Sequence, residues 1–146
     1  MKELVVDASV VLKWYLTDER YGPRALSLLE QHVAGEISLY APGILPYEVL
    51  NALIVAERMK RIPREVTDDA FDGFLDLDIT LVDPFSNYSH VMSIARTFGR
   101  SVYDASYLSL AGARDINLVT GDRRLYNAVK RKLKWVKWIG EVDTTS

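Results

Sequence analysis

Hydrophobic residues recur along this chain in two alternating patterns. Short aliphatic runs typical of buried strands in a parallel sheet occupy Leu4–Val6, Ile37–Tyr40, Ile79–Val82 and Ile116–Val119. Between them, apolar positions repeat at the three- and four-residue spacing of amphipathic helices, over residues 8–16, 25–33, 45–59, 66–77, 89–98, 104–114 and about 123–132. Residues 135–139 are expected to add a last edge strand.

The regular alternation of strands and helices favours one fold class. Strands joined through helices run parallel, and helices then cover both faces of the sheet. We therefore expect an α/β/α sandwich around a central, mostly parallel sheet of about four to five strands. Residues 1–146 are expected to form a single domain, since no repeat, linker or low-complexity tract interrupts the pattern.

Composition narrows the classes of function. Eighteen Lys and Arg against twenty Asp and Glu give a net charge of −2, so any contact with nucleic acid must be local. The absence of cysteine excludes a disulfide framework, a thiolate nucleophile and a zinc–thiolate site. Because Asp7 interrupts the first apolar run too early for a signal peptide or membrane span, a cytoplasmic protein is expected.

Four acids lie near the ends of predicted elements. Asp7 and Asp122 lie where a strand gives way to a helix, Asp104 opens a helix, and Glu48 lies in the first turns of another. Carboxyl ends of parallel strands share one edge of the sheet, where such folds bind ligands, so the four carboxylates are expected to converge. Helix capping is the competing interpretation for each aspartate, because Asp is a favoured N-cap residue.

Glu48 is harder to explain as a purely structural residue. Its helix is apolar almost all round, so the carboxylate is expected to be buried, and the nearest cations, Arg58 and Lys60, are too distant along that helix. Clustered carboxylates repel one another, and Mg²⁺ or Mn²⁺ would offset this repulsion. Since such a cation activates water and polarises a phosphoryl oxygen, phosphodiester hydrolysis is the indicated chemistry.

Four stretches surround these acids, namely Val5–Val11, Pro46–Leu53, Tyr103–Ala111 and Leu118–Asp122. In order, spacing and total chain length they resemble the PIN-domain family, and specifically the VapC-type toxins of toxin/antitoxin pairs. The resemblance covers essentially the whole chain. It implies a central parallel sheet, dependence on Mg²⁺ or Mn²⁺, endonucleolytic cleavage of RNA, a homodimer, and inhibition by a cognate antitoxin encoded nearby.

The resemblance also implies roles for individual residues. The metal-binding and catalytic acids would be Asp7, Glu48, Asp104 and Asp122. Ser9 and Thr120 match hydroxyl positions that support the site. Asn51, three residues after Glu48 on the same helix face, is expected to hydrogen-bond that carboxylate. The chain departs from the family at Leu125, where some members carry a further acid or amide, so occupancy of a second metal stays open.

Basic residues concentrate near the C-terminus. Seven lie within residues 123–137 without an acid among them, and Arg123 and Arg124 directly follow Asp122. These two arginines are candidates for binding RNA phosphate. The alternative is a solvated helix face that offsets the acidic residues at positions 65–83.

Two tyrosines and two histidines complete the set of candidates. Tyr103 and Tyr107 are four residues apart on one predicted helix face and could stack bases or line a dimer seam, although core packing is the commoner role. His32 and His90 are far from the predicted strand ends, so we expect neither to act in catalysis or metal binding.

The sequence therefore favours a divalent-metal-dependent endoribonuclease, the toxin component of a type II toxin/antitoxin system. Phosphoryl transfer on a receiver-like or dehalogenase-like fold is disfavoured, since no second Asp stands two residues after Asp7. Two alternatives stay open: a PIN-type nuclease in RNA processing or quality control without an antitoxin, and a non-catalytic RNA-binding module. The presence of all four acids makes the non-catalytic module the weaker of these alternatives.

Overall fold

The structure, a computed structural model, describes residues 2–83 and 87–142. The strands are β1 (Lys2–Val6), β2 (Ile37–Pro42), β3 (Thr80–Val82), β4 (Asn117–Thr120) and β5 (Val136–Trp138). The helices are α1 (Ala8–Tyr15), α2 (Gly22–Val33), α3 (Leu45–Arg58), α4 (Arg64–Leu75), α5 (Tyr88–Phe98), α6 (Val102–Arg114) and α7 (Arg123–Val129), with the short 3₁₀ helix η2 (Ile139–Glu141).

All five strands are parallel and lie in the order β3-β2-β1-β4-β5. The sheet grows from β1 through β2 to β3 and then reverses, so that β4 and β5 are added on the opposite side of β1. Such a reversal leaves a crevice between the carboxyl ends of the two strands involved. The register pairs Val6 with Val119, which brings the next residues, Asp7 and Thr120, to the same place at this edge.

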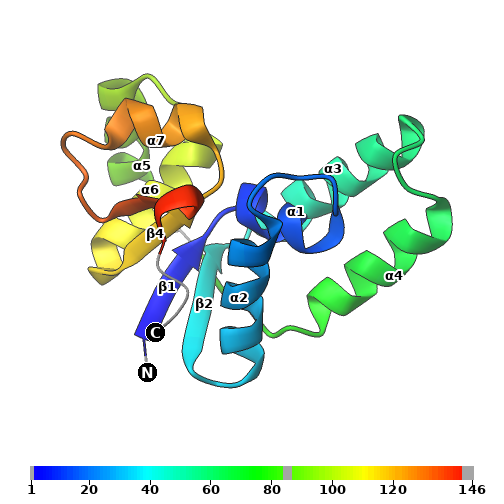
Figure 1. The fold of residues 1–146 in the computed structure, drawn as a ribbon. Coiled ribbons are helices and arrows are strands. Elements are labelled where there is room, and N and C mark those ends of the chain that lie inside the picture. The colour runs from blue at the N-terminus through cyan, green and yellow to red at the C-terminus, as the bar shows by residue number, and fades with distance from the viewer. Residues whose placement is uncertain (1, 84–86, 143–146) are drawn as a thin grey trace.

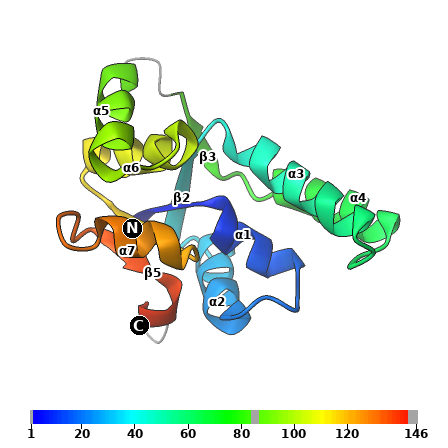
Figure 2. The same cartoon turned by 90° about the horizontal axis from the view of Figure 1, so that it is seen from above.

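Helices cover both faces of the sheet, as expected of an α/β/α sandwich (Figure 1). Helices α5 and α6 lie on one side, and α1 and α2 lie on the other. Helix α6 packs against β1, β2 and β4 and is buried continuously over residues 105–111. Helices α3 and α4 pack together and project to one side as a hairpin (Figure 2).

Several helix boundaries differ by one to three residues from the sequence expectation, and two of these differences concern candidate residues or their helices. Asp104 does not open its helix, because α6 begins at Val102 and the Ser101 hydroxyl caps it by accepting a 3.0 Å hydrogen bond from the Asp104 N–H. Helix α7 ends at Val129 instead of residue 132. Val129 is 1% exposed and is the last core residue of that helical pattern, so nothing apolar holds the lysine-rich residues after it in helical form.

Among the described residues, none of the helices has both the length and the apolar character that crossing a lipid bilayer requires.

Candidate metal centre

Asp7 follows β1 directly and is the N-cap residue of α1, where its carboxylate is 7% exposed. The hydroxyls of Ser9 and Thr120 each donate a hydrogen bond to one of its oxygens, and the Val10 N–H donates at 3.3 Å. Burial raises the pKa of Asp7 to about 6 although these hydrogen bonds lower it, and the negative charge of Asp122 adds to the rise. Asp7 is thus both a helix cap and a perturbed, buried acid.

The residues after β4 form the other side of the crevice. Asp122 caps α7, accepting hydrogen bonds from two backbone N–H groups of the first turn at 3.0 and 3.2 Å. Its own N–H donates to Thr120 Oγ1 at 3.0 Å, and the Gly121 N–H donates to Ser9 Oγ at 2.7 Å. These bonds link the start of α1 to the end of β4, so the positions of Asp7 and Asp122 are fixed relative to each other.

Glu48 lies in the first turn of α3 and is half-buried. The hydroxyl of Tyr107, on the buried side of α6, donates a 2.6 Å hydrogen bond to Glu48 Oε1. Burial raises the pKa of Glu48, and the charge of Asp104 adds to this, while the hydrogen bond from Tyr107 acts in the opposite direction. The helix is not buried all round, because Tyr47 and Val55 are exposed on it.

Tyr107 shows which of the acids come together. It is 2% exposed, and its pKa is strongly raised by burial and by the negative charges of Glu48, Asp7 and Asp104. These three carboxylates come from α3, the end of β1 and α6, and all of them act on one hydroxyl group. Since Asp122 in turn acts on Asp7, the structure brings all four predicted acids into one neighbourhood.

Asp104 is held differently from the other acids. Its Oδ2 atom forms an ion pair with Arg100, at 3.0 Å from Nη2 and 3.2 Å from Nε. Both side chains are partly exposed, at 22% for Arg100 and 28% for Asp104. Arg100 therefore supplies the positive charge beside this carboxylate, and the sequence analysis had not identified it.

The donor set consists of carboxylate and hydroxyl oxygens, which suit hard cations such as Mg²⁺ and Mn²⁺. Over the described ranges, however, no three His, Asp or Glu side chains are grouped as a metal ion would require. Protein donors engage each acid in this structure, through hydroxyls, an arginine or backbone N–H groups. The carboxylates suit a hard cation by their chemistry, and a cation at Asp104 would compete with the Arg100 ion pair.

The structure bears on two further expectations about neighbouring residues. Asn51 is exposed, and among the hydrogen bonds of the described residues none joins it to Glu48, so the expected bond is wrong. Asn51 lies on the solvent side of α3, and the donor to Glu48 comes from α6. Tyr103 and Tyr107 differ in environment, since Tyr103 is 60% exposed whereas Tyr107 is in the core.

The two candidate RNA-binding arginines lie at the start of α7 and are exposed. The Arg123 guanidinium lies over the Trp138 ring at 3.9 Å from its centroid. In the part of the chain that the structure describes, no ion pair joins Arg123 or Arg124 to an acid. Their proposed role toward RNA therefore stays a prediction.

The histidines form structural hydrogen bonds away from the four acids. His32 accepts from the Leu39 N–H at 3.3 Å through Nδ1, and its Nε2 lies 2.7 Å from the Leu77 carbonyl. His90 Nδ1 lies 2.8 Å from Ser109 Oγ. Both rings are thus engaged by partners other than the four acids.

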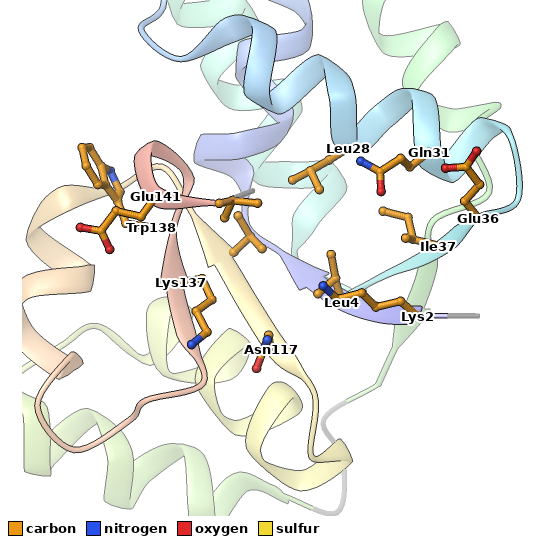
Figure 3. A pocket seen from close by; sticks show the side chains of 12 residues that line it. Lys2, Leu4, Leu28, Gln31, Glu36, Ile37, Asn117, Lys137, Trp138 and Glu141 are labelled. Carbon is orange, nitrogen blue, oxygen red and sulfur yellow. The ribbon is translucent and has the colours of Figure 1, made fainter. Parts of the chain in front are cut away.

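Two cavities differ in their relation to the acids. One, of about 570 Å³, lies between α2, η2 and the sheet (Figure 3), and its lining includes Lys2, Ile37 and Asn117 at the amino ends of three strands. None of the four acids lines it. The other, of about 700 Å³, is lined by Tyr47 and Tyr103, the chain neighbours of Glu48 and Asp104. The four acids themselves do not line the second cavity either.

Comparisons with known proteins agree on one family. A family model described as "PIN domain" matches residues 4–131. Ribonuclease VapC1 from each of two Mycobacterium tuberculosis strains is 31% identical over 130 residues, which cover 86% of this chain and 90% of that protein. The crystal structure of PAE2754 from Pyrobaculum aerophilum superposes with a TM-score of 0.71 at 23% identity, over 95% of this chain and 92% of that one. This last likeness supports the fold.

Proposed function

The chain belongs to the PIN-domain family, and we propose that it is a divalent-metal-dependent endoribonuclease, the toxin of a type II toxin/antitoxin pair. The likeness to proteins named Ribonuclease VapC1 supports ribonuclease activity. The observation that carries the metal site is the convergence of the charges of Glu48, Asp7 and Asp104 on the Tyr107 hydroxyl.

In this proposal Mg²⁺ or Mn²⁺ is held by Asp7, Glu48, Asp104 and Asp122. When bound, such a cation lowers the pKa of a water molecule and neutralises charge that develops on phosphoryl oxygens. The protein's contribution is to fix the ligands. Ser9 and Thr120 orient the two oxygens of Asp7, and Tyr107 orients Glu48 from the buried side.

The raised pKa of Asp7 has a consequence for binding a cation. With a pKa of about 6, about half of the metal-free protein carries a protonated Asp7 at pH 6 and about a tenth does so at pH 7. A cation binds the ionised carboxylate, so binding must release this proton. Metal affinity is therefore expected to rise with pH up to about neutrality.

The proposed partners are an RNA substrate, a cognate antitoxin protein and a second copy of the chain in a homodimer. The antitoxin separates this function from RNA processing by the same type of nuclease. A small reading frame immediately upstream, whose product binds this protein and relieves growth arrest on co-expression, would support the toxin. Growth arrest that no neighbouring gene product relieves would contradict it.

The nuclease itself is tested with purified protein and labelled RNA. We expect cleavage only with Mg²⁺ or Mn²⁺, and a loss of about a hundredfold or more in rate for Asp7→Ala, Glu48→Ala or Asp104→Ala. Asp122→Ala should be milder. Circular dichroism should show that each variant remains folded.

Asp68→Ala is the matched control, because Asp68 is an exposed acid on α4, outside the candidate centre. It should cleave at the wild-type rate. Full cleavage in excess chelator, or a wild-type rate for Asp104→Ala, would contradict the metal-dependent mechanism.

A further inference from the structure

One buried cation close to the candidate metal centre has no role so far. Lys13 lies in the last turn of α1 and is 8% exposed, in a helix that otherwise buries Val10, Val11 and Trp14. Lysine residues are rarely buried to this degree. Within residues 2–83 and 87–142 no hydrogen bond or ion pair of Lys13 is found, and its Nζ atom is not among the fully buried polar atoms that lack a partner, so the ammonium keeps contact with solvent.

The side chain of Lys13 is directed toward the crevice. Lys13 lies four residues after Ser9, hence on the same face of α1, and helical side chains point toward the helix N-terminus. Gly121, between Thr120 and Asp122, confirms this path: a Cβ atom there would lie 2.7 Å from Lys13 Cε. The Lys13 side chain therefore passes next to Gly121, which lies between the last residue of β4 and Asp122.

Gly121 lets the Lys13 side chain come close because glycine has no Cβ atom. Its φ is not positive, so the backbone conformation does not demand glycine. An added Cβ would also lie 3.1 Å from Ser9 Oγ, which accepts the Gly121 N–H hydrogen bond. The space at residue 121 is thus filled by the Lys13 methylene chain and the Ser9 hydroxyl.

Two other cations near this edge are already engaged, whereas Arg124 is exposed at the start of α7. Arg100 pairs with Asp104, and Arg123 lies over Trp138. The Lys13 side chain lies against Gly121, the residue before Asp122, and no ion pair joins its ammonium to an acid among the described residues. Its N–H donors are therefore available to a phosphate oxygen of RNA.

We propose that Lys13 binds a phosphate group of the RNA at the crevice between β1 and β4, and that Gly121 provides the clearance for it. This proposal rests on the proposed function, because it adds a residue to the same site. It assigns Lys13 a direct contact with the substrate, separate from the four acids that would hold the cation.

The test measures RNA binding without cleavage, by fluorescence anisotropy of a short single-stranded RNA in chelator over a series of salt concentrations. Lys13→Met should weaken binding about tenfold and reduce the slope of log affinity against log salt by about 0.7 units, the value for one lost phosphate contact. Lys13→Arg, which keeps the charge, should retain most of the slope. Lys137→Met, at an exposed lysine of β5, is the matched control.

Gly121→Ala provides a second variant, in which the charge remains but Lys13 is displaced. It should weaken RNA binding in the same direction as Lys13→Met. Isothermal titration with Mn²⁺ adds a readout that a purely structural role would move: Lys13→Met should bind Mn²⁺ at least as tightly as wild type. An unchanged salt slope in Lys13→Met, or weaker Mn²⁺ binding together with a lower melting temperature, would overturn the proposal.

The outcome is distinguishable from failure of the proposed function. If wild-type protein binds RNA with a slope that depends on Lys13 but cleaves nothing in Mg²⁺ or Mn²⁺, the nuclease is wrong and the phosphate contact holds. If it cleaves with metal while Lys13→Met binds and cleaves like wild type, the nuclease holds and the Lys13 proposal is wrong.

Discussion

The two halves of the candidate metal centre are built in different ways. Asp7 and Asp122 follow neighbouring parallel strands, and the pairing of Val6 with Val119 fixes their positions through the backbone. Glu48 and Asp104 lie on helices, and their carboxylates are held by single side-chain partners, Tyr107 and Arg100. Asp7 is buried, whereas Asp122, Glu48 and Asp104 are each partly exposed.

We therefore expect the strand-end half of the site to be rigid and the helix half to adapt when a cation binds. The sheet register and the hydroxyls of Ser9 and Thr120 restrain Asp7, so the strand-end half is preformed and stores the unfavourable burial of a charge. The helix half is held by side-chain contacts alone, and we expect a cation at Asp104 to replace its ion pair with Arg100. Changes in the strand-end half should therefore alter stability most, and changes in the helix half should alter mainly metal affinity.

The largest effect is expected for Asp7→Asn without metal. The pKa of Asp7 is about 6 in the folded protein against 3.8 for an unperturbed aspartate. The folded state thus binds a proton more tightly than the unfolded chain, and the wild type loses stability as pH rises from about 4 through 6. Asp7→Asn escapes this loss, so at pH 7 in chelator it should be more stable than wild type by about 3 kcal/mol.

Urea unfolding of both proteins between pH 4 and pH 8 measures this difference. Asparagine caps a helix about as well as aspartate, so loss of the α1 cap should not obscure the result. Asp68→Asn, at an exposed position on α4, should follow the wild type. If wild type and Asp7→Asn show the same pH dependence, then ionisation of Asp7 does not destabilise the folded protein. The proposed difference between the two halves of the site would then be wrong.

Most of the fold follows from the sequence pattern. The alternation of aliphatic runs and helical spacings predicts each strand and the parallel sheet, because parallel strands buried on both faces must be almost entirely apolar. The boundaries are less certain because caps decide them. Ser101 caps α6 three residues before Asp104, and nothing in the apolar spacing distinguishes that serine from other polar residues.

The site residues at the strand ends are easier to predict from the sequence than those on the helices. Asp7, Thr120 and Asp122 are predictable because strand ends share an edge of the sheet. The donor to Glu48 was assigned to Asn51 by helical spacing, but Tyr107, 59 residues away in sequence, supplies it through the packing of α6. The signal for Lys13, a single charge in the apolar run of α1, is visible in the sequence and was missed.

A smaller effect is expected when the buried donor of the helix half is removed. Tyr107→Phe deletes the hydrogen bond to Glu48 and should lower the free energy of unfolding at pH 7 by about 1–2 kcal/mol, allowing for partial solvent screening of a half-buried carboxylate. The hydrogen bond lowers the pKa of Glu48, so its loss raises that pKa further. The deficit should therefore grow as pH rises above about 4.5 and shrink in acid.

Tyr103→Phe is the control for this variant, since Tyr103 is on the same helix but 60% exposed. Chemical unfolding at pH 4 and pH 7 should leave it indistinguishable from wild type. A Tyr107→Phe deficit that is the same at both pH values would show that the hydroxyl contributes packing alone and does not position Glu48.

The smallest effect on stability, and the one most specific to the helix half, is expected for Arg100→Met. The Arg100–Asp104 ion pair is partly exposed, so solvent screening limits its contribution to about 0.5–1 kcal/mol. A cation at Asp104 competes with this pair, and removing the arginine should therefore tighten Mn²⁺ binding by about two- to fivefold. Isothermal titration with Mn²⁺ measures the change directly, with melting temperatures in chelator as the stability readout.

Arg96→Met, at an exposed arginine of α5, should leave both quantities unchanged. If Arg100→Met instead weakens Mn²⁺ binding, then Arg100 orients Asp104 for the cation and the helix half is preformed like the strand ends. If the affinity does not change at all, Asp104 lies outside the set of ligands. Tighter Mn²⁺ binding at nearly constant stability is the result expected if a cation at Asp104 replaces the Arg100–Asp104 ion pair.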